Sequence, residues 1–263
     1  MNLDRVKQIG VRAAYRAGER INQYFGKAFR VTKKGVMDLV TEADFASEEI
    51  VLATIREAFP DHAILAEESG ASNSPSPDLW IIDPLDGTTN FAHGLPIFSV
   101  SIAYSHNNQI MLGVVFNPIN GELFTAVRGG GAALNGEAIH VSATATVGDS
   151  LLVTGFPYSV RTACPPLPLN RFERCLTAAQ GIRRLGSAAL DLCYVACGRF
   201  DGFWEEQLKP WDTAAGMLIA TEAGGRVTDF ADHLFNINDK QLLATNGAIH
   251  AEMIGLLNLK DCA

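Results

Sequence analysis

The chain has 263 residues, of which 48% are hydrophobic, 19% charged and 8% aromatic. This length and composition predict a folded protein with one large core or two smaller ones, and they exclude a disordered or collagen-like chain. The formal net charge of −8 is the opposite of what neutralising nucleic-acid phosphates requires. We therefore expect no direct, general nucleic-acid binding, and an anionic substrate would need metal ions or local dipoles to recruit it.

Hydropathy and cysteine usage favour a cytoplasmic protein. No stretch of about 18 apolar residues is present, so no membrane span is predicted, and the N-terminal residues lack the apolar core of a signal peptide. The number of cysteines, five, is odd, and Cys193 and Cys197 lie four residues apart in a predicted helix. We interpret these two as small buried hydrophobes rather than metal ligands or a disulfide.

In the first half of the chain, two amphipathic helices precede a series of short strands. Apolar residues at helical spacing predict one helix over about 3–25. A second helix over 42–59 has an apolar stripe of Phe45, Leu52, Ile55 and Phe59, and Pro60 stops it. Strands separated by Asn-, Pro- and Gly-rich turns then predict an antiparallel sheet backed by the two helices, at 63–66, 79–83, 97–104, 110–116 and 122–127.

The second half alternates strands and helices, which is typical of an α/β arrangement. Composition shifts to Gly, Ala, Thr and Ser over 128–150, so we place a boundary near residue 140, between halves 1–140 and 141–263. The Pro-rich stretch 161–169 is predicted to be a loop. Strands are predicted at 151–154, 182–185, 201–205, 226–228 and 241–245, and helices at about 170–180, 187–197, 212–223 and 248–258.

Acidic residues follow the strand at 63–66. Adjacent strand residues point to opposite faces, so only one of Glu67 and Glu68 is expected to face a shared site. Taken alone, a solvated strand end is the more ordinary interpretation of this pair.

A second acidic segment joins a strand to a helix. The apolar strand is predicted to end at Asp83, and a tight turn at Pro84 would bring Asp83 and Asp86 to one side. Gly87 permits a close approach, and residues 88–90 are expected to cap the helix that follows. Helix N–H groups favour an anion whereas the two carboxylates repel one, and divalent cations such as Mg²⁺ would resolve that conflict. The alternative is a simple capped connection.

Asp212 begins a later apolar helix, where a structural N-cap is the ordinary interpretation. If Glu67, Asp83, Asp86 and Asp212 shared one cleft, their like charges would raise one another's pKa values. Two or three Mg²⁺ ions would balance these charges and form a site for in-line phosphoryl displacement.

These segments together resemble the inositol monophosphatase family of Mg²⁺-dependent phosphatases, and the resemblance runs in order along nearly the whole chain. The matching motifs are Asp83–Phe91, Trp211–Gly216, Glu67–Ser69 and Asp38–Asp44, and the stretches 155–158 and 186–191 look most like bacterial members. The resemblance implies a layered α-β-α-β-α sugar-phosphatase fold, with an α+β half 1–140 that holds most metal ligands. The α/β half 141–263 would add Asp212 and the substrate contacts across a cleft between the halves.

The resemblance also implies a role for each matching residue. One Mg²⁺ would be held by Glu67, Asp83 and the Leu85 carbonyl. A second would be held by Asp83, Asp86 and Asp212, and a weaker third by Glu67 near Asp44. The N–H groups of Gly87 and Thr88 would receive the phosphate, beside Asp86. Glu67 and Thr88 would orient a metal-activated water, and Asp44 would support Thr88. Glu205, Ser187 and Ala188 would contact the substrate hydroxyls, and no histidine base is needed.

The expected activity is Mg²⁺-dependent hydrolysis of myo-inositol monophosphates by a phosphoric monoester hydrolase, with lithium sensitivity and a homodimeric assembly. Dual fructose-1,6-bisphosphatase activity stays open, for which a cation such as Arg184 would have to meet the distant phosphate; Arg183 and Arg184 could equally form dimer ion pairs. Histidinol phosphate is a further alternative substrate. A hypothesis of another class is a bacterial transcription-machinery partner that uses the fold as a protein-binding scaffold.

Overall fold

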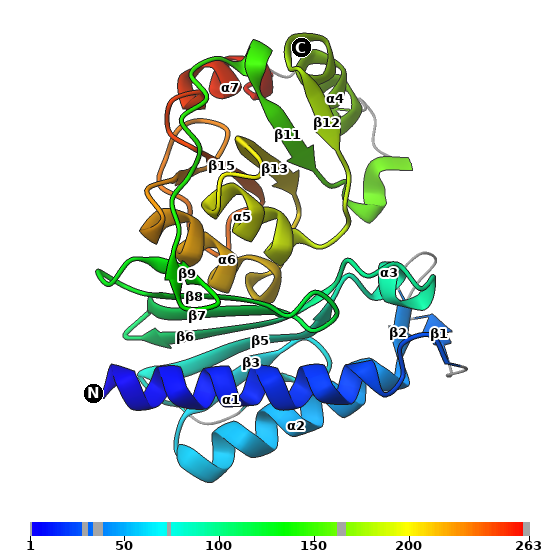
Figure 1. Ribbon diagram of the computed structural model, residues 1–263, viewed down its shortest axis with the longest axis vertical. Coiled ribbons are helices and arrows are strands. Elements are labelled where there is room, and N and C mark those ends of the chain that lie inside the picture. The colour runs from blue at the N-terminus through cyan, green and yellow to red at the C-terminus, as the bar shows by residue number, and fades with distance from the viewer. Residues whose placement is uncertain (1, 28–30, 34–38, 73–74, 162–166, 260–263) are drawn as a thin grey trace.

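The computed structural model describes residues 2–27, 31–33, 39–72, 75–161 and 167–259 of the chain, and its elements form five layers (Figure 1). Helices α1 (Leu3–Asn22) and α2 (Glu42–Ala58) cover the outer face of an eight-stranded sheet. Helices α5 (Ala188–Ala196) and α6 (Pro210–Glu222) lie between that sheet and a five-stranded one. Helices α4 (Leu167–Ala178) and α7 (His250–Leu257) close the far side. The layers follow the predicted α-β-α-β-α order.

The first sheet is buried on both faces, and its alternating side chains feed two cores. Trp80 and Ile82 pack toward α1 and α2, whereas Ile81 between them packs toward α5 and α6, as the two-residue period of a strand requires. All neighbouring strands are antiparallel except β3 and β5. In sheet order the strands are β10 (Glu137–Ala138), β9 (Ala132–Leu134), β8 (Glu122–Val127), β7 (Gln109–Asn117), β6 (Ser99–His106), β5 (Asp78–Asp86), β3 (Ala63–Ala66) and β4 (Gly70–Ala71).

The second sheet mixes parallel and antiparallel pairs. Strand β11 is parallel to β12 and β13, and β15 is antiparallel to β13 and β14. Its order is β12 (Gly181–Arg183), β11 (Leu151–Thr154), β13 (Gly202–Glu206), β15 (Gln241–Thr245) and β14 (Arg226–Thr228). Smaller elements are the paired strands β1 (Val31–Lys33) and β2 (Leu39–Thr41), helix α3 (Thr88–Ala92), and the 3₁₀ turns η1 (Val147–Asp149) and η2 (Tyr158–Arg161).

The expectations for the apolar stripe of α2 and for the stretch 161–169 are wrong. Phe45 does not belong to the buried stripe of α2: its side chain is 54% exposed, and Val51 and Ile55 occupy the buried face instead. The stretch 161–169 is not all loop, because α4 begins at Leu167; residues 162–166 lie outside the described part of the chain. The boundary near residue 140 stays a prediction, since one core cluster contains residues of both halves. Within the described ranges, no helix has the length and apolarity needed to cross a membrane.

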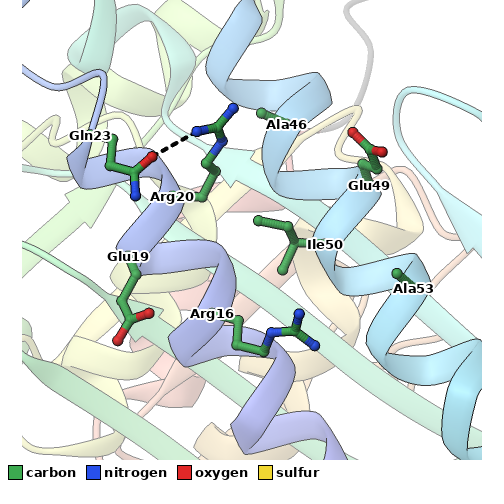
Figure 2. A pocket seen from close by; sticks show the side chains of 8 residues that line it. All are labelled: Arg16, Glu19, Arg20, Gln23, Ala46, Glu49, Ile50 and Ala53. Carbon is green, nitrogen blue, oxygen red and sulfur yellow. Dashed lines mark hydrogen bonds between the residues drawn. The ribbon is translucent and has the colours of Figure 1, made fainter.

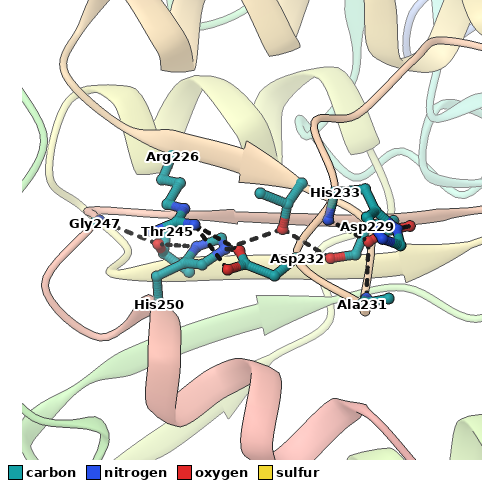
Figure 3. Close-up of polar contacts among 9 residues, drawn as sticks. Arg226, Asp229, Ala231, Asp232, His233, Thr245, Gly247 and His250 are labelled. Atoms are coloured by element: carbon teal, nitrogen blue, oxygen red, sulfur yellow. Dashed lines mark hydrogen bonds and ion pairs between the residues drawn. The ribbon is translucent and has the colours of Figure 1, made fainter.

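A buried histidine ties the second sheet to α7 (Figure 3). His250, only 1% exposed, lies between the Thr245 hydroxyl at Nδ1 (2.8 Å) and the Thr228 hydroxyl at Nε2 (2.9 Å). Asp232 lies 3.2 Å from Nε2, and both its oxygens accept hydrogen bonds from Arg226 at 2.8 Å. We refer to these five residues as the His250 cluster.

Candidate active site

An irregularity in β5 turns two carboxylates to one face of the sheet. Asp83 pairs with Ser101 and Asp86 with Ser99, so three steps on β5 oppose two steps on β6. The extra residue reverses the side-chain alternation, as β-bulges do, and Asp83 and Asp86 therefore share a face. The strand continues to Asp86 rather than ending at Asp83 as predicted. Both side chains are buried, with 2% and 9% exposed.

Asp86 is held by the second half of the chain. Its Oδ2 accepts hydrogen bonds from the Ser187 hydroxyl at 2.6 Å and the Ala189 N–H at 2.8 Å. Ser187 is completely buried, so in this structure its hydroxyl positions Asp86. Ala188, predicted beside it as a substrate contact, is the first residue of α5, and its backbone N–H also bonds to Asp86. The segment before α5 thus couples the two halves at a candidate ligand.

Asp212 lies in the first turn of α6 but does not cap it. The N-cap is Lys209, and the Asp212 carboxylate accepts the Lys209 N–H at 2.7 Å, which is the reciprocal half of a capping box. Burial raises the pKa of Asp212 to about 8, with the charges of Asp86 and Glu67 adding to the shift and the Lys209 N–H opposing it. A purely structural cap would stabilise the charged form, whereas burial and the neighbouring charges disfavour it here, which is typical of a functional carboxylate.

Glu67 belongs to the same group, because its charge acts on Asp83. Burial raises the pKa of Asp83 well above its ordinary value, and the charges of Glu67, Asp86 and Asp212 raise it further. Of the neighbouring pair after β3, it is thus Glu67 whose charge acts on the cleft, while the Glu68 N–H donates to Glu48 at 2.9 Å. We call Glu67, Asp83, Asp86 and Asp212 the carboxylate cluster. In the described part of the chain no three His, Cys, Asp or Glu side chains approach closely enough to form a ready-made metal site. The ligand set therefore stays a prediction.

Gly87 and Thr88 begin helix α3 beside this cluster. Gly87 is the N-cap at φ +98, and a Cβ there would lie 2.9 Å from the Ile97 carbonyl oxygen, so only glycine fits. The prediction that residues 88–90 cap the helix is wrong. The Thr88 hydroxyl instead lies 3.0 Å from Asp44 Oδ1 and 3.0 Å from the Leu85 carbonyl oxygen.

Asp44 is a fully buried carboxylate at the start of α2. It accepts both the N–H (2.8 Å) and the hydroxyl (2.6 Å) of Thr41, in a capping box, besides lying next to Thr88. Burial raises the pKa of Asp44 to about 6, although the bonds from Thr41 and Thr88 oppose the shift and Glu67 adds to it. The predicted Asp44–Thr88 contact is therefore present. Asp38, at the start of the matching motif, lies outside the described residues.

Glu205, near the end of β13, is not a solvated strand end. Burial raises its pKa to about 8, with Asp212 adding to the shift and Arg184 acting against it. Its carboxylate packs against Gly155, where an added Cβ would lie 2.1 Å from Oε2. The next acid, Glu206, is distinguished by its ion pair with Arg171 at 2.8 Å.

Two residues near the site had no predicted role. Gly155 leaves room for Glu205, and Asp191 in α5 is a nearly fully buried carboxylate whose Oδ1 has no hydrogen-bond partner among the described residues. Burial raises the pKa of Asp191, and the charge of Glu205 adds to that shift. Residue type alone could not single out either position, because small residues and helix acids are common.

A separate hollow lies on the outer face of the first half (Figure 2). This groove of about 440 Å³ contains none of the predicted site residues. Ala46, Ile50 and Ala53 of α2 form its apolar part, and the remaining lining residues are Arg16, Glu19, Arg20, Gln23 and Glu49.

Comparisons with known proteins identify the family. The sequence-family model described as "Inositol monophosphatase family" matches residues 2–259. The chain belongs to the inositol monophosphatase family. It is similar to the inositol-1-monophosphatase of Synechocystis sp., with 48% identity over 94% of this chain and 86% of that protein. It is also 45% identical to the Nus factor SuhB of Haemophilus influenzae, over 94% of this chain and 93% of that one.

Solved structures confirm the predicted fold. The extragenic suppressor protein suhB from Bartonella henselae superposes with a TM-score of 0.92 at 41% identity, covering 96% of this chain and 98% of that one. The inositol monophosphatase from Anabaena gives a TM-score of 0.89 at 44% identity, over 98% and 96%. The family and fold inferred from the sequence motifs are both correct.

Proposed function

We propose that this chain is a Mg²⁺-dependent phosphomonoesterase that hydrolyses myo-inositol monophosphates to inositol and phosphate. Family membership and relatives named inositol-1-monophosphatase, at 41–48% identity, bear out the predicted enzyme class. The observation in the chain itself that carries the proposal is the carboxylate cluster beside the N-terminus of α3, in which the charges of Glu67 and Asp86 add to the raised pKa values of Asp83 and Asp212.

The chemistry of this cluster suits Mg²⁺. Carboxylate and carbonyl oxygens are the ligands that this ion prefers, and cations would offset the repulsion among Glu67, Asp83, Asp86 and Asp212. Two to three ions per site, with the Leu85 carbonyl as a further ligand, are the expected content. When bound, Mg²⁺ supplies positive charge that lowers the pKa of water and stabilises the leaving oxygen. Lithium sensitivity would follow from occupation of one of these positions.

The chain's own residues bind the phosphate and orient the attacking water. The N–H groups of Gly87 and Thr88 would hold the phosphate oxygens at the helix start. Thr88 has one hydroxyl proton, and ionised Asp44 is its charged acceptor at 3.0 Å. The lone pairs of the Thr88 oxygen then remain free to accept a hydrogen bond from a water on the other side. Glu67 would accept a second hydrogen bond from the same water. Asp44 thus acts through Thr88 as a positioning residue.

Glu205 would bind the polyol. It lies near the end of β13, within range of the Asp212 charge, and a carboxylate can accept hydrogen bonds from two vicinal hydroxyls. The Glu205 carboxylate therefore favours inositol phosphates, whose leaving group carries hydroxyls, over substrates whose leaving group is anionic.

Phosphate release from a substrate panel tests the proposal. Inositol 1-phosphate, fructose 1,6-bisphosphate, 3′-phosphoadenosine 5′-phosphate and histidinol phosphate would be compared with Mg²⁺, with EDTA, and with Asp86→Asn. We expect inositol 1-phosphate to lead and both controls to abolish release. If another substrate leads, the metal proposal survives and the role given to Glu205 is wrong. If the folded protein with Mg²⁺ hydrolyses none, the proposed function is wrong.

A second candidate is a protein-binding role, because relatives at 45–47% identity carry the name Nus factor SuhB. Such a partner of the transcription machinery would bind independently of hydrolysis. Asp86→Asn separates the two roles, since it should remove hydrolysis and leave a scaffold intact. If a cellular phenotype is lost with the folded variant, the scaffold role is excluded.

We further expect a cytoplasmic protein that forms a homodimer. A monomer mass by solution scattering at micromolar concentration would contradict the dimer.

A further inference from the structure

Ser99 of β6 lies directly opposite Asp86 in the ladder between β5 and β6. Side chains at directly opposite positions of antiparallel strands point to the same face, with Cβ atoms about 4.5–5.5 Å apart. Along β6, Ala103 packs toward α5 and α6, whereas Val100 packs toward α1 and α2. The two-residue period of the strand therefore places Ser99 on the α5 side of the sheet, with Asp86.

The Ser99 side chain is completely buried, and its hydroxyl has no hydrogen-bond partner among the residues that the structure describes. The next serine on the same face, Ser101, is also buried, but its hydroxyl donates to the Trp211 carbonyl oxygen at 3.2 Å. Buried hydroxyls normally have a partner, and an unpaired one costs folding free energy. The unpaired donor at Ser99 thus calls for an acceptor on this face of the sheet.

The donors that hold Asp86 all come from one element. Among the described residues they are the Ser187 hydroxyl and the N–H groups of Ala188 and Ala189, at the start of α5. Mg²⁺ demands nearly octahedral positions of its oxygen ligands, so a carboxylate ligand has to be fixed in orientation. Hydrogen-bonding partners of ligands do this, and they set metal affinity in many proteins. A donor from the sheet would fix Asp86 from a second direction.

We propose that Ser99 is a positioning residue of the proposed metal site. Its hydroxyl donates a hydrogen bond to the Asp86 carboxylate from the sheet, in addition to the bonds from α5, and holds this carboxylate in the orientation that Mg²⁺ requires. A carboxylate suits this donor, because a hydrogen bond to a charged acceptor is about twice as strong as one between neutral groups. The inference rests on the proposed function, in which Asp86 is a ligand of Mg²⁺.

Calorimetric titration with Mg²⁺, without substrate, tests this role. We expect Ser99→Ala to weaken the affinity for at least one Mg²⁺ about tenfold or more, a loss typical of removing a hydrogen-bond partner of a metal ligand. Ser150→Ala is the matched control. Ser150 is also completely buried, but its hydroxyl donates to the Val147 carbonyl oxygen at 2.7 Å, in the second half of the chain. Its loss should leave the affinity unchanged. Equal affinities in wild type and Ser99→Ala would overturn the assignment.

Thermal unfolding separates positioning of a metal ligand from a purely structural role. In EDTA, Ser99→Ala should not lower Tm, since the hydroxyl that it removes has no acceptor. With Mg²⁺ present, its Tm should be below that of the wild type, because stabilisation by a ligand follows the affinity. Ser150→Ala should lower Tm to the same extent in both conditions. The same behaviour in Ser99→Ala would show a structural role and contradict the proposal.

A crystal structure of the wild type grown with Mg²⁺ identifies the acceptor. Ser99 Oγ should lie within about 2.5–3.0 Å of an Asp86 carboxylate oxygen. A hydroxyl that stays unpaired, or that donates to another group, would overturn the assignment. In assays with inositol 1-phosphate, the half-saturating Mg²⁺ concentration of Ser99→Ala should rise by the factor seen in calorimetry, with kcat at saturating Mg²⁺ close to that of the wild type.

The outcomes distinguish this inference from the proposed function. If the wild type hydrolyses inositol 1-phosphate with Mg²⁺ and Ser99→Ala binds the ion equally tightly, the Ser99 assignment alone is wrong. If the wild type binds Mg²⁺ more tightly than Ser99→Ala but hydrolyses no substrate of the panel, the proposed function is wrong and the role of Ser99 stands. If the wild type binds no Mg²⁺, both are wrong.

Discussion

The carboxylate cluster and the His250 cluster are both polar and both contain buried groups, but their charges are balanced differently. In the His250 cluster, Arg226 neutralises Asp232, and each nitrogen of His250 has a hydroxyl partner (Figure 3). In the carboxylate cluster, burial and like charges both raise the pKa of Asp83. Asp86 accepts hydrogen bonds from the Ser187 hydroxyl and from backbone N–H groups of α5, but has no cationic partner among the described residues.

This contrast separates structural from functional polarity. A buried polar group that the protein satisfies internally adds specificity to the fold at little cost. A cluster of like charges costs folding free energy, and such local conflicts concentrate at functional sites. The two clusters should therefore respond to substitution in opposite ways, one in activity and the other in stability.

The largest effect is expected at Asp83. Asp83→Asn should lower kcat/KM for inositol 1-phosphate on the order of 10²- to 10³-fold, a loss typical of removing one electrostatic stabiliser. In EDTA the same variant should have a higher Tm than the wild type, because the charge that Glu67, Asp86 and Asp212 all oppose is gone. Its carbonyl oxygen can still accept the Leu85 N–H, now at 2.9 Å to Asp83 Oδ1.

Enzyme assays and thermal unfolding in EDTA measure the two quantities side by side. Asp232→Asn is the matched control at the other cluster, where the lost charge was paired with Arg226. It should leave kcat/KM unchanged and should not raise Tm. A lower Tm for Asp83→Asn in EDTA would contradict the view that the cluster is electrostatically costly.

The next largest effect is on stability at His250. His250→Ala leaves the Thr228 and Thr245 hydroxyls without their ring partners in a site that is almost fully buried. The free energy of unfolding should fall by about 2–3 kcal/mol, with activity per folded molecule unchanged. His233, which is 78% exposed and bonded to Asp229 at 2.9 Å, provides the control. Urea unfolding of His233→Ala should show a change below about 1 kcal/mol, and a similar loss in both variants would refute the assignment.

Local patterns were enough to place most elements. Strands β3, β8, β11, β14 and β15 have the predicted bounds, and all but β14 are short, largely apolar runs. Strands β9 and β10 were missed because they lie at the sheet edge and have little buried apolar pattern. Phe45 was misplaced because an apolar side chain on a helix does not reveal by type whether a partner covers it.

The sequence indicated which carboxylates lie together, but not the contacts that hold them. The charges of Glu67, Asp86 and Asp212 all act on Asp83, whereas their role as metal ligands stays a prediction. The hydrogen bond from Ser187 to Asp86 joins positions 101 residues apart, and no local pattern encodes such a pair. The turn expected at Pro84 was in fact a bulge within a continuing strand, because pairing with β6 resumes at Asp86.

A smaller effect is expected at Gly155, where a substitution would alter a proposed substrate contact without changing any charge. Gly155→Ala would place a Cβ about 2 Å from the Glu205 carboxylate, so that flexible side-chain end must move. We expect KM for inositol 1-phosphate to rise about tenfold with a smaller change in kcat, as one polyol hydrogen bond to a charged group is lost. Gly148→Ala is the matched control, since its nearest atom would be 3.8 Å away. Steady-state kinetics showing equal KM values for both variants would remove Glu205 from the substrate contacts.

The last prediction concerns the sign of pH dependence, which should differ between the two clusters. Burial lowers the pKa of His250 below its ordinary value of 6.5, so the unfolded chain binds more protons in the window just below that pH. The stability that His250 contributes is therefore present above pH 6.5 and is lost as pH falls toward the lower folded-state pKa. For Asp86 and Asp212, burial raises the pKa to about 6 and about 8, so the folded chain binds more protons and stability is lost as pH rises through those values.

Urea unfolding in EDTA from pH 5.5 to 8.5 tests both signs. The stability deficit of His250→Gln relative to wild type should disappear at low pH. Asp212→Asn should instead gain its advantage at high pH, because the charge whose repulsion grows there is absent. Equal slopes for wild type and both variants would mean that neither cluster is linked to protons in the way that its burial and charges indicate.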